Sequence, residues 1–208
     1  MSLREIRQSS QRVAKALGYP TNPNLPLLEP VERLRPIDAL VNRTLCLHAS
    51  VACSYGFQKD RAVEWLKQEG IYGYLAGSEV RYLQGKSDGN KPLFQWQVES
   101  LWVMTWITSF HDNLDFSDSC SDGLSSLLPD LKEGAPSIEF KEAAAARKVE
   151  EVVASLDLAY CLHWAIRDAE LAGRPMPGKV PPLVIRERRR ALEWVVSNED
   201  WDDIVLDT

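Results

Sequence analysis

The sequence predicts an all-α fold, an irregular multi-helix bundle around a central apolar helix, with Pro-rich connectors. Apolar residues recur at spacings of three and four along several segments, and Pro and Gly gather between those segments. No alternating strand pattern of useful length occurs in the sequence. The chain has 208 residues, 45% of them hydrophobic and 26% charged, so it can bury a core of its own. We expect one helical domain over residues 1–208.

The N-terminal part, residues 1–36, is predicted to be a helix followed by a packing segment. Ser2 is the expected N-cap of a helix over residues 2–17, with Glu5 three residues on, as in a capping box. Prolines then forbid regular structure up to residue 36. This stretch is also too apolar to be a free linker, so we expect it to lie across the domain surface.

The middle of the chain is predicted to contain the central helix. Helices are expected at residues 36–55 and 60–69 and a short one at residues 78–83, followed by a loop at residues 86–91. Residues 93–110 then carry apolar side chains around nearly the whole helical circumference, which indicates a buried helix. A run of Ser and Asp predicts a surface loop at residues 115–123.

The last third is predicted to be two helices and a docked tail. Residues 139–172 are strongly helical with a break near Arg147, and a final helix is expected over residues 183–196. We expect the segment at residues 149–166 and the final helix to clasp the central helix. Residues 197–208 form an acidic C-terminal tail that docks on the domain.

Composition and charge limit the classes of partner and the cellular location that the protein can have. The net charge of −6 disfavours a nucleic-acid or acidic-membrane partner. The sequence shows no secretory signal and no apolar stretch long enough to span a membrane, so we expect a soluble, cytoplasmic protein. Cys46 and Cys53 are seven residues apart in a predicted helix, roughly 10.5 Å, which is too far for a disulfide. We therefore expect reduced thiols.

The familiar catalytic and cofactor motifs are absent from the sequence. It contains no paired-cysteine or two-histidine zinc pattern, no Gly-x-Ser-x-Gly elbow and no dinucleotide glycine fingerprint. We expect no metal and no cofactor. One alternative is a divalent cation held by Asp202, Asp203 and a histidine.

Glu99 is the first unusual polar residue, because nearly all its neighbours in the predicted central helix are apolar. A buried carboxylate needs a cation or several donors. We favour an ion pair that locks two helices, and the alternative is a general acid or base in a cleft. The expected partners lie in residues 157–168, where Arg167 can pair with Glu99 or with Asp168.

The same segment carries a histidine on its apolar stripe. Tyr160, His163 and Arg167 share one helical face, and Trp164 and Asp168 share the adjacent face. A lone histidine in such a place is more often a satisfied core residue than a catalytic base. Both interpretations of His163 stay open at this point.

The last predicted helix carries four arginines, Arg186, Arg188, Arg189 and Arg190. Arg188 falls on the apolar stripe and is predicted to be an interior ion-pair partner, whereas the other three are expected to form a solvated basic face. We expect Trp201 to dock in a groove while the neighbouring acids face the basic run.

Several blocks of the sequence carry a resemblance to a known family. They are Trp96-Gln-Val-Glu99-Ser-Leu-Trp102, Leu156-Asp157-Leu-Ala-Tyr160-Cys-Leu-His163-Trp164-Ala-Ile-Arg167-Asp168, Glu187-Arg188-Arg-Arg-Ala191-Leu192-Glu-Trp194 and Asp200-Trp201-Asp202-Asp203. Over most of its length the chain resembles the bacterial family catalogued as domain of unknown function 4272. The resemblance implies that the unusual polar residues converge, and it implies no activity.

The leading functional hypothesis is a binding module for a protein partner or a small ligand, in one form a toxin-neutralising or accessory protein. The expected binding residues are Trp102, Tyr160, Arg167, Arg188, Trp201, Asp202 and Asp203. The alternative is a hydrolase or transferase that uses Glu99 or Asp168 with His163 in a cleft between helices.

Overall fold

The computed structural model describes residues 1–86 and 91–207, so most of the loop predicted at residues 86–91 lies outside the described residues. Nine α-helices and no strand occur in this part of the chain, which confirms the all-α fold class. The α-helices are α1 (Leu3–Ala16), α2 (Ile37–Ser54), α3 (Lys59–Gln68), α4 (Gly77–Leu83), α5 (Lys91–Trp96), α6 (Val98–Ile107), α7 (Ile138–Ala143), α8 (Val149–Leu171) and α9 (Pro182–Val196). Short 3₁₀ helices are η1 (Tyr72–Tyr74), η3 (Asp122–Leu127) and η4 (Trp201–Asp203).

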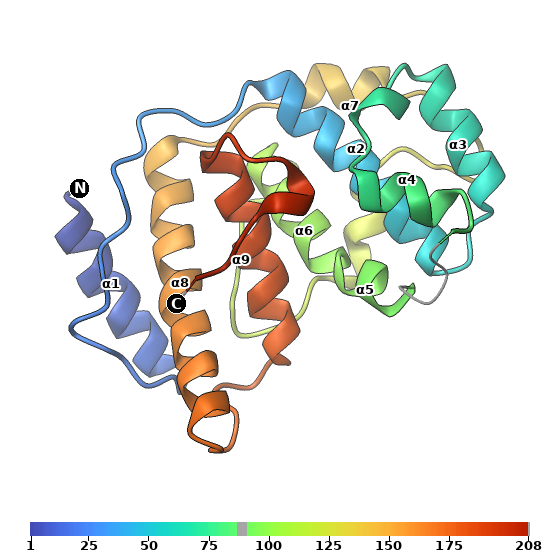
Figure 1. Cartoon of the computed structure of the whole chain (residues 1–208). Coiled ribbons are helices and arrows are strands. Elements are labelled where there is room, and N and C mark those ends of the chain that lie inside the picture. The colour runs from blue at the N-terminus through green and yellow to red at the C-terminus, as the bar shows by residue number, and fades with distance from the viewer. Residues whose placement is uncertain (87–90, 208) are drawn as a thin grey trace.

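The long helices pack in a row in the order α1, α8, α9, α6 and α2 (Figure 1). The shorter helices α3, α4 and α5 surround α2 at the far end of this row. The main neighbours of α6 are thus α2 and α9, while α8 packs between α1 and α9. The predicted clasp of the central helix by α8 is therefore wrong, because α9 lies between the two helices.

The N-terminal predictions are confirmed in detail. The backbone N–H of Glu5 donates to Ser2 Oγ at 3.3 Å, and the backbone N–H of Ser2 donates to Glu5 Oε2 at 2.7 Å, which makes a capping box. The Pro-rich segment runs along α1 and then across to the start of α2 (Figure 1). Arg7 holds it by donating to the carbonyls of Leu25 at 2.6 Å and Pro26 at 2.8 Å.

The predicted continuous helix at residues 93–110 is wrong at two points. A turn at Gln97 separates α5 from α6, with ψ near −6°, so that α5 packs on α2 while α6 packs on both α2 and α9. The helix then ends at Ile107 because Ser109 adopts a left-handed backbone with φ of 66°. Glycine usually takes this terminating conformation, so a serine there gave no signal in the sequence.

Among the described residues, three buried ion pairs connect neighbouring helices. Their members are Arg7 and Asp157 (α1 to α8), Arg43 and Glu79 (α2 to α4), and Arg188 and Glu99 (α9 to α6). All six side chains are at most 7% exposed. A buried charge that loses its partner is strongly destabilising, so these pairs fix which helices lie side by side.

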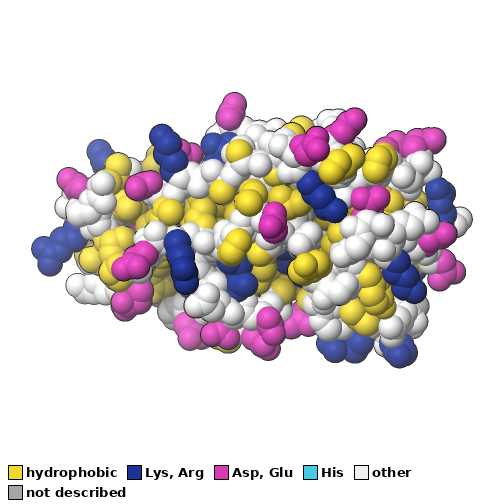
Figure 2. Space-filling model, turned by 90° about the horizontal axis from the view of Figure 1, so that it is seen from above, with side chains coloured by type: hydrophobic (Ala, Val, Ile, Leu, Met, Phe, Trp, Pro, Cys, Tyr) yellow, Lys and Arg dark blue, Asp and Glu magenta, His cyan; other side chains and the backbone are white. Residues whose placement is uncertain are grey.

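The surface carries charges of both signs. Figure 2 shows acidic and basic side chains interspersed over one face, with hydrophobic side chains between them. A single-sign field of the kind that attracts nucleic acid is absent from this face. No helix among the described residues has the length and apolar character needed to cross a membrane. All four cysteines are free thiols.

Candidate functional site

Glu99 forms a buried ion pair, but with a different partner from the one expected. Its Oε2 accepts hydrogen bonds from Arg188 Nε at 2.8 Å and Nη2 at 2.7 Å, and its Oε1 accepts from the backbone N–H of Cys120 at 2.9 Å. Arg188 also donates to the carbonyls of Asp115 and Asp118. The expected partner segment at residues 157–168 was wrong, whereas the interior role predicted for Arg188 is confirmed. This pair fastens the 115–120 loop onto α6 and α9.

His163 contacts a neighbour of Arg188. Arg189 Nη1 donates to His163 Nδ1 at 2.8 Å, so Nδ1 is the unprotonated nitrogen and Nε2 carries the hydrogen. Burial, together with the positive charges of Arg189, Arg186 and Arg167, lowers the pKa of His163 to about 3. The imidazole is therefore neutral at physiological pH, and a histidine with so low a pKa is a poor general base.

The remaining members of the predicted cluster lie elsewhere. Asp168 pairs with Arg174, and Arg167 pairs with Glu170, so the expected pairing of Arg167 with Glu99 or Asp168 is wrong. The Tyr160 ring contacts two guanidinium groups, with its centroid 5.5 Å from Arg7 Cζ and 4.7 Å from Arg189 Cζ. Trp102 stacks on His111 with ring centroids 3.6 Å apart. The structure thus joins Glu99 to Arg188 but gives His163, Arg167 and Asp168 separate partners.

The arginine run of α9 is more buried than expected. Arg189 is 4% exposed, and Arg190 is partly covered by the C-terminal tail, so only Arg186 is as exposed as predicted. The tail contacts these arginines through its backbone: Arg189 donates to the carbonyl of Asp207 at 2.7 Å, and Arg190 donates to the carbonyl of Trp201 at 3.4 Å. Backbone carbonyls give no charge signal, which is why the sequence did not reveal this contact.

The predicted docking of Trp201 is confirmed, since its side chain is buried at 3% exposure. The acids beside it do not face the basic run as expected. Asp202 instead accepts hydrogen bonds from the backbone N–H of Ser78 at 2.7 Å and from its hydroxyl at 2.5 Å, which ties the tail to α4. Asp203 is exposed.

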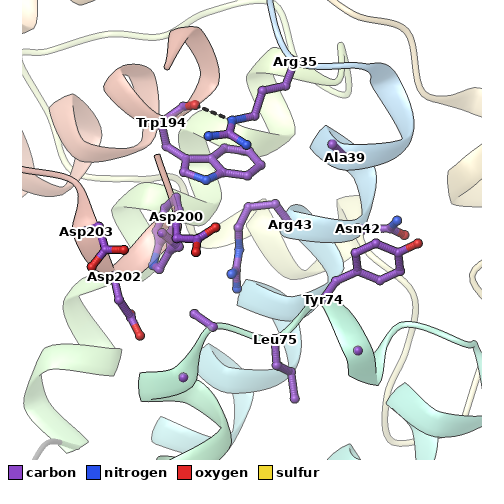
Figure 3. A pocket seen from close by; sticks show the side chains of 14 residues that line it. Arg35, Ala39, Asn42, Arg43, Tyr74, Leu75, Trp194, Asp200, Asp202 and Asp203 are labelled. Carbon is purple, nitrogen blue, oxygen red and sulfur yellow. Dashed lines mark hydrogen bonds between the residues drawn. The ribbon is translucent and has the colours of Figure 1, made fainter. Parts of the chain in front are cut away.

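The docked tail forms one wall of a cavity of about 530 Å³, which we call the Arg–Trp cavity (Figure 3). The start of α2, the turn between η1 and α4, the end of α9 and the tail all contribute side chains. In Figure 3, Arg43 extends from α2 into the space between Asp200 and Tyr74. The volume lies within the range of small-molecule sites.

Two arginines and two tryptophans are layered along this cavity. Arg35 Cζ lies 4.1 Å from the ring centroid of Trp194, and Arg35 Nε donates to the Trp194 carbonyl at 2.7 Å. Trp194 meets Trp201 edge to face, with centroids 5.8 Å apart. On the next layer, Arg43 Cζ lies 4.9 Å from the Trp201 ring. Cation–π contacts of this kind hold the aromatic side chains in fixed orientations.

The charge of Arg43 is balanced by Glu79. One carboxylate oxygen of Glu79 pairs with Arg43 and also accepts from Ser50 Oγ at 3.2 Å, and the other accepts from the backbone N–H of Ala76 at 2.8 Å. Arg43 is 4% exposed and Glu79 is 0% exposed. The pair therefore fixes the turn that borders the cavity.

Two buried donors at this cavity have no acceptor among the described residues, Arg43 Nε–H and Trp201 Nε1–H. The face of the Trp201 ring gives Arg43 a weak partner. The Trp201 N–H has no hydrogen-bond acceptor among the described residues. A buried donor left unpaired costs roughly 1–3 kcal/mol, and proteins normally satisfy it with water or with a ligand.

Sequence reasoning missed the two arginines of this site. Arg43 did carry a signal, because it is a lone charge in the apolar stretch at residues 39–54, the same criterion that singled out Glu99. Arg35 carried none, since it lies in an irregular segment between two prolines, Pro30 and Pro36. No group of three or more metal-ligating side chains is assembled within residues 1–86 and 91–207.

Comparison with known proteins identifies a family without assigning a reaction. No match was found among curated proteins or among solved structures. The family model described as Domain of unknown function (DUF4272) matches residues 6–204. Because this match covers nearly the whole chain, the protein belongs to the DUF4272 family.

Proposed function

We propose that this protein is a binding module for a small zwitterion, such as an amino acid, held in the Arg–Trp cavity. The observation that carries the proposal is the pair of buried donors, Arg43 Nε–H and Trp201 Nε1–H, beside a cavity of about 530 Å³. A ligand carboxylate supplies acceptors for both donors. Charge-assisted hydrogen bonds of this type are stronger than neutral ones.

The acidic rim supports a ligand that also carries a positive charge. Asp200 and Asp203 line the cavity and are exposed, and neither forms an ion pair in the part of the chain that the structure describes. In Figure 3 the Asp200 carboxylate and the Arg43 guanidinium face the same space. The carboxylate of a zwitterion then lies deep beside Arg43, and its ammonium group lies at the rim.

Tyr74 adds a selective surface at the cavity. Tyr74 is 59% exposed although it lines the cavity, so it can contact a ligand side chain. Aromatic faces bind apolar and cationic groups. We expect amino acids with an aromatic or cationic side chain to bind more tightly than glycine.

The location we propose is the bacterial cytoplasm. Support comes from four free thiols, three of which are buried. Burial raises the pKa of Cys46 to about 12, so this thiol is unreactive, and unpaired cysteines are typical of reducing compartments.

The experiment is an amino-acid titration followed by NMR. Each of the seven tryptophans gives one indole N–H signal, and Trp201→Phe identifies the signal of Trp201. A ligand that supplies an acceptor moves this signal downfield in a saturable way at millimolar concentration. The comparison ligands are the corresponding amino-acid amides, which keep the ammonium group and lack the free carboxylate.

A matched pair of variants tests the rim. Asp200→Asn removes the proposed partner of the ammonium group, and we expect binding to weaken roughly tenfold to hundredfold. Asp118→Asn is the control, because Asp118 is also exposed but lines a different surface hollow. The proposal is refuted if no amino acid moves the Trp201 signal, or if both variants change the affinity equally.

A further inference from the structure

A second cavity, of about 660 Å³, lies between α5, α8, α9 and the C-terminal tail, and we call it the α8–α9 cavity. It shares no lining residue with the Arg–Trp cavity. His163 and Arg167, both singled out in the sequence, line it, and the tail contributes Ile204 and Leu206. The function proposed above leaves these residues without a role.

Positive charge is in excess around this cavity. Arg167, Arg186 and Arg190 line it, against Glu170 and Glu187. Glu170 pairs with Arg167. Glu187 is buried and accepts from the Ser100 hydroxyl at 2.9 Å. Arg186 is exposed and has no ion-pair partner among the described residues.

Two polar atoms of lining residues are buried without a partner. Gln97, which is 6% exposed, has no hydrogen bond to its Oε1 from any described residue, and Arg190 likewise has none from its Nε. His163 adds a further donor, because its Nδ1 is occupied by Arg189 and its Nε2 carries the hydrogen. Unpaired groups of this kind in one cavity indicate a polar ligand group or water that supplies their partners.

The rest of the wall is apolar. The lining includes Leu93, Phe94, Ile166, Leu183, Ile204 and Leu206. Leu93 is 59% exposed, which leaves a large apolar side chain facing water. A ligand that covers such side chains gains about 25 cal/mol for each Å² of apolar surface removed from water.

We propose that the α8–α9 cavity binds an organic anion with a hydrocarbon part, such as a medium-chain carboxylate. The carboxylate lies at the arginine side and accepts from Arg190 and Arg186, and the hydrocarbon part lies against the apolar wall. Gln97 Oε1 accepts from a water or hydroxyl group that accompanies the head group. The two cavities have no lining residue in common, but they are neighbours, because Arg190 of this cavity donates to the backbone carbonyl of Trp201 in the other.

The test compares ligands that differ in one property each, by calorimetry on the full chain. Octanoate carries both the anion and the hydrocarbon part. Octanol lacks the charge, octylamine reverses it, and acetate lacks the chain. We expect saturable binding of one octanoate per chain, at least tenfold tighter than any of the other three. Equal binding of octanoate, octanol and octylamine overturns the proposal, as does the absence of octanoate binding at millimolar concentration.

Two matched variant pairs locate the site. Arg186 is exposed and lines the cavity, whereas Arg174 is exposed and does not line it. Arg186→Gln is expected to weaken octanoate binding severalfold or more, and Arg174→Gln to leave it unchanged. Leu93→Asn is expected to weaken octanoate binding. Ile138→Asn is its control and is expected to have no effect, because Ile138 is an aliphatic residue of similar size and exposure that lies on α7.

These results separate this site from the zwitterion site. If both variants of a pair weaken octanoate binding equally, or if neither variant weakens it, octanoate binds elsewhere and the proposal is overturned. The Trp201 indole signal of the previous experiment is a distinct readout at the other cavity. Loss of one kind of binding with retention of the other therefore identifies which proposal has failed.

Discussion

The buried pair of Glu99 and Arg188 allows a quantitative prediction for the substitution Glu99→Gln. Arg188 is 0% exposed and Glu99 is 2% exposed, so no water can take over the lost charge interaction. Leaving one member of a buried pair uncompensated costs about 3–5 kcal/mol. Against a typical total stability of about 5–15 kcal/mol, this loss is a large fraction of the free energy of unfolding.

The assay is urea unfolding followed by circular dichroism, with a matched substitution as control. Glu170→Gln removes the same charge from an exposed pair, in which Arg167 is 49% and Glu170 is 39% exposed. Exposed pairs contribute about 0–1 kcal/mol, so this control should lower stability little. A loss for Glu99→Gln no larger than that for Glu170→Gln would refute the reasoning.

A double substitution separates charge compensation from loop anchoring. Glu99→Leu with Arg188→Met removes both charges, and replacing a buried pair by apolar side chains is often neutral or stabilising. The loop loses its anchors all the same, because Arg188 bonds the carbonyls of Asp115 and Asp118 and Glu99 bonds the Cys120 N–H. We expect recovered global stability together with faster hydrogen exchange at Cys120. Unchanged exchange there would contradict the anchoring role.

Three further predictions concern other contacts. The pKa of His163 is about 3 in the folded chain and about 6.5 in the unfolded chain, so between these pH values the unfolded state binds more protons. The contribution of His163 to stability should therefore be full above pH 6.5 and fall as the pH falls towards 3. His163→Gln should flatten this part of the curve when urea midpoints are measured as a function of pH. Ser2→Ala removes the N-cap of α1 and should cost about 1 kcal/mol in the same unfolding assay, with Ser2→Thr retaining most of the stability. Asp202→Asn weakens the tie to Ser78, so limited proteolysis should cut the tail faster and the total tryptophan fluorescence should shift to the red. Unchanged cleavage would show that burial of Trp201 alone holds the tail.

Local sequence signals determined the helices, because they act over one or two turns. The capping residues Ser2 and Glu5 lie within one turn of each other, and the apolar periodicity that predicts α2 and α8 repeats every three or four residues. Helix ends were less certain where the terminating residue was unusual, as at Ser109. The burial of Glu99 and of Arg188 was also visible, since each is a charge on an apolar stripe.

The tertiary structure alone decided which charges meet. Glu99 and Arg188 are 89 residues apart in the chain, and Arg7 and Asp157 are 150 apart, so their pairing depends on the order in which the helices pack. Periodicity shows that a face is buried but not which helix covers it.

The composition of the Arg–Trp cavity likewise follows from the fold. Arg35, Arg43, Trp194 and Trp201 come together only after α2 and α9 have packed and the tail has docked. The sequence by itself thus determined an all-α chain with buried charges and a docking tryptophan. The tertiary structure decided the partners of those charges and the two cavities, because hydrogen bonds and ion pairs between distant segments form only once packing has fixed the geometry.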